Sequence, residues 1–110
     1  MAITKITARQ RQFLFLHLTV NLGSLGPEAT DHRTAIEGVL DKAKDWLRYL
    51  PNSWLIYTSR SAIAWHKDLH QLPNMKQYQF LICEVNINNK AGWLYESVWT
   101  WINQNRDQQP

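Results

Sequence analysis

The segment that decides the fold is 46–58, which reads Trp46-Leu47-Arg48-Tyr49-Leu50-Pro51-Asn52-Ser53-Trp54-Leu55-Ile56-Tyr57-Thr58. The helical spacing of the residues before it could continue as far as Leu50. However, Pro51-Asn52-Ser53 is typical of a turn, and residues 54–58 are β-branched and aromatic. Two short strands around a tight turn form a β-hairpin. We therefore expect the helix before the hairpin to end near Lys44.

The residues before the hairpin predict one strand and one helix. Residues 13–22 are apolar and β-prone, and glycines and a proline follow them, which indicates a central strand. Thr30 or Asp31 can cap the helix that comes next. Its apolar face is given by residues at helical spacing, namely Ile36, Val39, Leu40 and Ala43.

The residues after the hairpin predict a helix, a strand and a final helix. Ser59 or Ser61 can cap the first of these helices, and Pro73 lies just beyond its end. Its apolar face consists of Ala62, Trp65, Leu69 and Leu72. Residues 78–87 form a further strand, and residues 88–92 turn the chain into a helix from about Trp93 to Asn103.

This order predicts an α+β fold of the ferredoxin-like βαββαβ type, a four-stranded antiparallel sheet with an additional C-terminal helix. Right-handed crossovers place the first two helices on one face of the sheet. Six tryptophans and four tyrosines are more than such a small core holds. We therefore expect the last helix or a second subunit to cover the other face. The prediction is a homodimer with Trp93, Trp99 and Trp101 in its interface.

Length and composition indicate a single domain over 1–110. The chain has 12 Lys and Arg, 9 Asp and Glu, four His and a formal charge of +3. Its single cysteine excludes an internal disulfide framework and fits a reducing, cytoplasmic setting. No apolar run approaches the roughly 20 residues of a membrane span, and the first residues lack the apolar stretch of a signal peptide.

The two ends of the chain are polar. Residues 1–11 form a basic arm, since Lys5, Arg9 and Arg11 precede the first carboxylate, Glu28. Arg9 and Arg11 can neutralise phosphates of a nucleic acid, and the alternative is an ordinary solvated terminus. Residues 104–110 are predicted to be a polar tail.

Two tryptophan-rich motifs resemble those of a known family. Residues 45–59 resemble the aromatic hairpin of small SinR-like proteins, and the closing pattern is Gly92-Trp93-Leu94 with Trp99-Thr100-Trp101-Ile102. The resemblance covers about residues 13–103. That family is similar in fold to the small ferredoxin-like CRISPR adaptation protein, whose relatives include metal-dependent nucleases and nuclease-like toxins or antitoxins.

The resemblance implies a homodimer and contact with nucleic acid. The family's first-strand aspartate, which can ligate Mg²⁺, falls on Asn21 in this chain. A neutral amide is a poor ligand for a cation that prefers carboxylates. We therefore expect a degenerate metal position, no catalytic residue and no cofactor, with Mg²⁺ needed only if the chain is a nuclease.

The segment Ser59-Arg60-Ser61 is a candidate phosphate site. It joins a strand to the N-terminus of a helix, where free N–H groups, hydroxyls and a guanidinium can hold one phosphate. Helix capping by Ser59 or Ser61 accounts for the same hydroxyls. Ser24 lies in a glycine-containing loop that lacks the P-loop pattern, so we expect only a loop there.

Histidine and cysteine residues give weaker candidates. His66 and His70 share a helix face at a spacing that suits zinc, but no third ligand is evident, and a solvent-facing pair is the alternative. His17 is either a base in an open cleft or a hydrogen-bonded residue of the sheet. Cys83 is expected to be a small apolar core residue.

Three functions fit these patterns. The first is a non-enzymatic dimer that binds nucleic acid or a protein partner, in a defence or toxin–antitoxin setting. The second is a metal-dependent endonuclease, and the third is an interaction module without a nucleic-acid role. Exposed aromatic residues can stack on unpaired bases or anchor a protein interface, and both roles are open to the tryptophans.

Overall fold

The computed structural model describes residues 12–23, 27–73 and 75–106. The described strands are β1 (Leu14–Val20), β2 (Asp45–Leu50), β3 (Ser53–Thr58) and β4 (Phe80–Val85). The helices are α2 (Pro27–Leu40), α3 (Ala62–His70) and α4 (Glu96–Arg106), with a short 3-10 helix η1 at Met75–Gln77. Along the chain these elements follow in the order β1, α2, β2, β3, α3, η1, β4 and α4.

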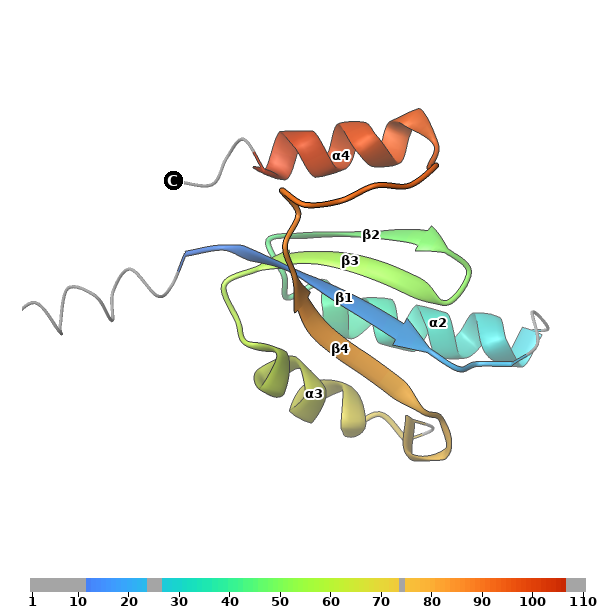
Figure 1. The fold of residues 1–110 in the computed structure, drawn as a ribbon. Coiled ribbons are helices and arrows are strands. Elements are labelled where there is room, and N and C mark those ends of the chain that lie inside the picture. Colours follow the sequence, from blue (N-terminus) through green and yellow to red (C-terminus); the bar gives the residue numbers. More distant parts are fainter. Residues whose placement is uncertain (1–11, 24–26, 74, 107–110) are drawn as a thin grey trace, which may run out of the picture.

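The four strands form one antiparallel sheet in the order β2-β3-β1-β4. Leu16 on the central strand β1 is opposite Ile56 of β3 on one side and Glu84 of β4 on the other. Helices α2 and α3 cover one face of this sheet, and α4 lies over the opposite face (Figure 1). The α+β class and the antiparallel four-stranded sheet are therefore confirmed.

The predicted β-hairpin is present. β2 ends at Leu50 and β3 begins at Ser53, with Pro51 and Asn52 in the turn. The carbonyl of Asn52 accepts a hydrogen bond from the N–H of Val20 (3.1 Å), which ties the turn to β1. The deciding segment therefore adopts the strand pair rather than a longer helix.

Both ends of α2 differ from the prediction. The helix begins at Pro27, so Thr30 and Asp31 lie inside it and do not cap it. Proline suits the first turn because the N–H that it lacks has no partner within the helix there. At the other end α2 stops at Leu40, and turn hydrogen bonds such as Ala43 N–H to Leu40 C=O (2.9 Å) lead into β2.

The last helix is displaced from its predicted bounds. It begins at Glu96 rather than Trp93, and it continues to Arg106, three residues into the segment predicted to be a tail. Asn105 is buried and donates from Nδ2 to the carbonyl of Trp101 (3.1 Å). The remaining tail residues, 107–110, lie outside the described residues.

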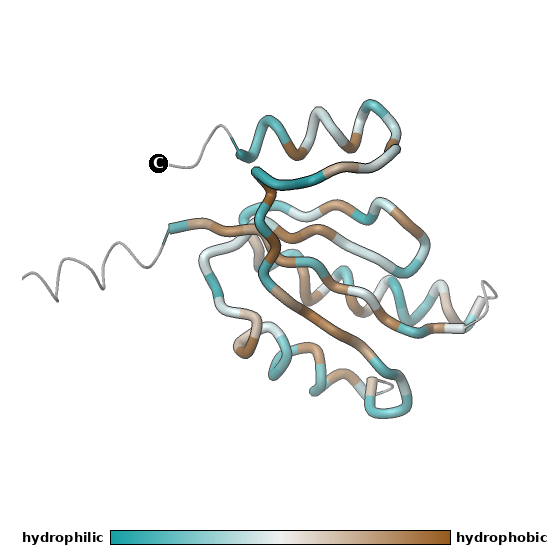
Figure 2. The backbone as a smooth tube through the Cα atoms, viewed as in Figure 1, coloured by the Kyte–Doolittle hydropathy of each residue, from teal (hydrophilic) through white to brown (hydrophobic). Residues whose placement is uncertain are grey.

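The sheet separates two apolar clusters. The larger one fills the space between the sheet and helices α2 and α3, and its most buried members are Leu18, Ile36, Leu40, Trp54, Ile56, Trp65 and Leu69. The second lies between the sheet and α4, and consists of Phe15, Leu55, Tyr57, Ile87, Val98 and Ile102. Figure 2 shows the hydrophobic residues concentrated along the strands. We expected either the last helix or a second subunit to cover the second face of the sheet. In the structure the last helix of the same chain covers it.

Asp45 at the start of β2 anchors α4 to the sheet. Its Oδ2 accepts hydrogen bonds from Trp101 Nε1 (2.9 Å) and Asn105 Nδ2 (3.4 Å). The Trp101 ring also meets the ring of Phe15 edge-on, with centroids 6.1 Å apart. Hydrogen bonds and aromatic contacts thus add to the apolar burial under α4.

We expect Asp45→Ala to lower the free energy of unfolding by about 1–2 kcal/mol. The substitution leaves the Trp101 and Asn105 donors without their acceptor, and a lost hydrogen bond to a charged group costs about that amount. Urea unfolding followed by circular dichroism measures the change. Asp31→Ala, at an exposed position on α2, is the control, and an equal loss in both variants would contradict the anchoring role.

No helix in the described part of the chain is both long enough and apolar enough to cross a membrane.

Candidate functional site

An apolar groove runs between the end of β2 and the segment that leads into α4. It has a volume of about 360 Å³ and is lined by Tyr49, Leu50, Trp93, Leu94, Tyr95 and Val98. We call it the aromatic groove. The side chain of Trp93 is 98% exposed, that of Tyr95 84% and that of Leu50 50%. Large apolar residues gathered in one hollow are typical of a binding site, whereas single exposed ones need no explanation.

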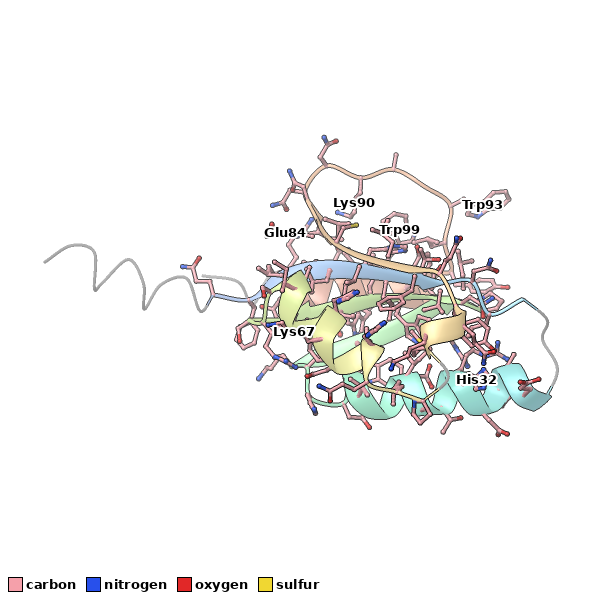
Figure 3. The ribbon with its side chains drawn as sticks, turned by 90° about the horizontal axis from the view of Figure 1, so that it is seen from below. His32, Lys67, Glu84, Lys90, Trp93 and Trp99 are labelled. Carbon is pink, nitrogen blue, oxygen red and sulfur yellow. The ribbon has the colours of Figure 1, made fainter. Side chains whose placement is uncertain are left out.

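The wall of the groove is fixed by the start of α4. The carbonyl of Tyr95 accepts hydrogen bonds from the N–H groups of Val98 (2.9 Å) and Trp99 (3.3 Å). Leu94 and Val98 belong to the second apolar cluster, whereas Trp93 points away from the body of the protein (Figure 3). The backbone beside Trp93 is therefore held by packing while its ring stays in solvent.

A second hollow adjoins the aromatic groove. It is lined by Arg33, Arg48, Tyr49, Leu50 and Pro51 and has a volume of about 330 Å³. We call it the arginine hollow. Tyr49 and Leu50 line both hollows. Arg33 comes from α2, on the sheet face opposite α4, so the two hollows lie on either side of the end of β2.

The cations of the arginine hollow are held in place. Arg33 donates to Asn52 Oδ1 (3.2 Å) and to Thr30 Oγ1 (3.3 Å), and most of its side chain is buried. Arg48 lies 3.6 Å from a carboxylate oxygen of Glu37. Two guanidinium groups against one carboxylate leave an excess of positive charge in the arginine hollow.

Tyr49 is positioned by a hydrogen bond to His17. The Tyr49 hydroxyl lies 2.5 Å from His17 Nε2, and the two rings are 5.6 Å apart. Burial lowers the pKa of His17 and raises the pKa of Tyr49, so both groups are neutral at pH 7. Which of the two groups donates is set by the tautomer of the neutral His17 ring. His17 is thus a hydrogen-bonded residue of the sheet, which is one of the two roles predicted for it.

The lowered pKa of His17 predicts that stability falls in mild acid. The unfolded chain takes up a proton near the ordinary pKa of 6.5, whereas the folded chain takes it up only at lower pH. The unfolded state therefore binds more protons in that window, and the free energy of unfolding decreases as pH falls below about 6.5. We expect His17→Gln to weaken this dependence in urea unfolding between pH 7.5 and 5. Identical pH profiles for the two proteins would contradict it.

The structure uses the segment Ser59-Arg60-Ser61 mainly for internal contacts. The hydroxyl of Ser61 caps α3 by accepting from the N–H of Ala64 (3.2 Å). The Arg60 guanidinium lies 2.8 Å from Asp68 and 4.5 Å from the centroid of the Trp65 ring. Its hydrogen bond holds the pKa of the Asp68 carboxyl below the usual value. The capping alternative is observed, Ser59 is exposed, and a phosphate contact here stays a prediction.

The other predicted site residues do not gather at one place. Arg9, Arg11 and Ser24 lie outside the described residues. Asn21 is exposed just beyond β1 and helps to line a hollow of about 520 Å³ with Thr19, Gly23, Asn52 and Gln79 among its neighbours. The lining of that hollow includes no carboxylate. In the described ranges no group of three or more His, Cys, Asp or Glu side chains could hold a metal ion.

The three tryptophans predicted for an interface have different surroundings. Trp99 and Trp101 are partly buried and pack against the second apolar cluster under α4. Only Trp93 is left in solvent. The assignment of all three to a dimer interface stays a prediction, but two of them already have a role within the chain.

The remaining candidates are placed as follows. The rings of His66 and His70 stack 5.6 Å apart on α3, and His66 also stacks on Phe80 at 5.2 Å. Cys83 is only partly buried and lies opposite His17 in the sheet. We expected a small apolar core residue, and the structure shows Cys83 at an intermediate burial within the sheet.

Sequence reasoning found Trp93 but missed the rest of the aromatic groove. Tyr49, Leu50 and Tyr95 were assigned to a strand and a helix and not to a site. One signal was present, since Leu50 is a large apolar residue directly before the proline of a turn. Comparison with known proteins adds no relative, because no family model, no curated protein and no solved structure matches the chain.

Proposed function

We propose that this chain is a non-catalytic, ferredoxin-like protein that binds single-stranded nucleic acid in the aromatic groove. The ferredoxin-like plan is supported by the order of strands and helices and by the position of α2 and α3 on one face of an antiparallel sheet. The observation that carries the function is the pair of exposed rings, Trp93 and Tyr95, in the aromatic groove. Tyr49 and Leu50 of this groove also line the arginine hollow.

Stacking and charge fit one ligand class at this place. Each base stacked on an aromatic ring contributes about 1–3 kcal/mol, and stacking tolerates any base because every base has a π-face. The guanidinium groups of Arg33 and Arg48 can attract the phosphates of the same strand. A duplex keeps its bases stacked on each other, so it cannot use Trp93 and Tyr95 in this way.

The groove is also ready to bind without rearrangement. Tyr49 is held by His17, Arg33 is held by Asn52, and the carbonyl of Tyr95 accepts hydrogen bonds from the first turn of α4. Groups that are already ordered lose little further entropy on binding. No observation on the described residues favours the endonuclease alternative, and a protein partner is an outcome of the test below.

The test is the affinity for a labelled 12-nucleotide single strand, compared with a duplex of the same sequence. Fluorescence anisotropy at 50 and 200 mM salt, with and without Mg²⁺, gives the dissociation constants. We expect binding to the single strand only. Two phosphate contacts predict a slope of roughly −1.4 in log K against log salt, since each contributes about −0.7 on single strands.

Two results would overturn the proposal. The first is absence of binding to the single strand at 50 mM salt, which would move the function to a protein partner. The second is equal affinity for the duplex, which would show that stacking is not used. Cleavage that requires Mg²⁺ would instead support the endonuclease alternative.

A further inference from the structure

The outer edge of β4 has no strand beside it in the described chain. β4 is the last strand in the order β2-β3-β1-β4 and pairs only with β1. Figure 1 shows the chain leaving β4 to cross toward α4 instead of folding back along this edge. Unpaired N–H and C=O groups along such a strand are a template for another strand.

The two edges of the sheet differ in how they are protected. β2 has a register irregularity between Arg48 and Leu50, is followed by Pro51, and is joined to α4 through Asp45. Irregularities, prolines and covering elements are the usual means of blocking an edge. β4 reads Phe80-Leu81-Ile82-Cys83-Glu84-Val85, with no lysine, proline or bulge, and Leu81 is 59% exposed. Of the two sheet edges in the described residues, the edge of β4 is therefore the one open to pairing.

We propose that two copies of this chain associate through β4, which pairs antiparallel with β4 of the second copy to give one continuous eight-stranded sheet. A two-fold axis brings the same strand from both copies together, so one surface serves both partners. This inference is independent of the proposed binding of nucleic acid.

The alternation of side chains along β4 restricts the register. Phe80 and Ile82 pack toward α3, and Glu84 follows them on that face, whereas Leu81 and Cys83 point to the other face. A two-fold axis perpendicular to the sheet leaves each face on its own side. Residues of the same face must therefore be opposite each other, so the pair is centred on a residue rather than between two residues.

Charge selects the register centred on Ile82. α3 lies beneath β4 and exposes His66, Lys67 and His70, and the ring of His66 is stacked on Phe80. Glu84 is exposed and has no ion pair among the described residues. With Ile82 opposite itself, Glu84 of one copy lies opposite Phe80 of the second copy, beside the His66 ring that stacks on Phe80. A register centred on Cys83 would place Glu84 opposite Ile82 instead.

The mass in solution tests the surface. Light scattering without nucleic acid should give twice 13.0 kDa for the wild type and a monomer for Leu81→Lys, since a lysine on an edge strand opposes pairing. Leu50→Lys is the matched control, because Leu50 is about equally exposed on the opposite edge strand. It should stay a dimer. Circular dichroism shows that each variant is folded.

Cysteine crosslinking tests the register. Opposite residues on antiparallel strands have Cα atoms about 4.5–5.5 Å apart, which a disulfide can span. The register places Leu81 opposite Cys83 of the second copy, so Leu81→Cys should form a covalent dimer on mild oxidation. The Leu81→Cys variant that also carries Cys83→Ala should form none, and neither should the wild type.

Each possible result bears on the inference. A monomeric wild type, or a dimer that Leu50→Lys breaks and Leu81→Lys does not, would overturn the β4 surface. A covalent wild-type dimer through Cys83 would overturn the register centred on Ile82. Loss of the dimer in Leu81→Lys, together with crosslinking that depends on both cysteines, would support the surface and the register.

Discussion

Replacing Trp65 by alanine should lower the free energy of unfolding by about 3–5 kcal/mol, the usual cost of removing a large aromatic side chain from a core. Trp65 is fully buried at the centre of α3 and packs in the larger apolar cluster. A cavity of this size cannot be filled by its neighbours, because protein interiors are close-packed. Urea unfolding followed by circular dichroism measures the loss.

The polar contacts of Trp65 add to this cost. Its Nε1 donates to Thr58 Oγ1 (3.2 Å), and the guanidinium of Arg60 lies over its ring. The ring is thus the link between the end of β3 and the helix that follows. Trp65→Phe keeps most of the apolar volume and removes the N–H donor, so we expect a smaller loss of about 1–2 kcal/mol.

Trp93→Ala is the matched control for this prediction. Both substitutions remove the same side chain, but Trp93 is almost fully exposed, and exposed positions usually change stability by less than about 0.5 kcal/mol. Equal losses for the two variants would contradict the division of the tryptophans into core and surface residues.

Local sequence patterns were sufficient to predict the strands that form the sheet. The turn signal at Pro51-Asn52 and the β-prone residues after it predicted the hairpin, which places β2 beside β3. The cap of α3 was also local, since Ser61 lies three residues before the N–H that it accepts from. Because these features depend on residues that are neighbours in the sequence, they could be predicted from the sequence.

Features that depend on distant residues could not be predicted in the same way. α4 extends to Arg106 while Asn105 contacts Asp45, which is 60 residues away in the chain. The segment 104–106 is polar in sequence and was predicted to be a tail, but its contact with Asp45 makes it part of the helix. Arg60 is a second case, because its internal partners Asp68 and Trp65 depend on the packing of α3 and could not be read from its charge, while a phosphate contact at Arg60 stays a prediction.

The aromatic groove shows the same limit. It joins Tyr49 and Leu50 on β2 to residues 93–95 before α4, and only the packing of α4 over the sheet brings them together. The tryptophan count indicated an aromatic surplus without saying where it was. The structure divides the surplus, since Trp54 and Trp65 are buried, Trp46, Trp99 and Trp101 are partly buried, and Trp93 is exposed.

The largest expected effect on binding is that of removing both exposed rings from the groove. We expect Trp93→Ala combined with Tyr95→Ala to weaken binding of the 12-nucleotide single strand by about 2–6 kcal/mol, since each stacked base contributes about 1–3 kcal/mol. The dissociation constant should therefore rise by at least roughly 30-fold, and at the upper end of this range binding would no longer be detected. Trp93→Phe with Tyr95→Phe keeps two π-faces, so most of the affinity should remain.

The double variant also separates stacking from charge and from folding. Its slope of log K against log salt should match that of the wild type, because the arginines are unchanged, whereas Arg48→Ala should reduce the slope by about 0.7. Its unfolding free energy should be close to that of the wild type, since both rings are exposed. Ile63→Ala is the control, because Ile63 is 72% exposed on α3, away from the groove. If the double variant binds as tightly as Ile63→Ala, the rings do not hold bases and the aromatic groove is not the binding site.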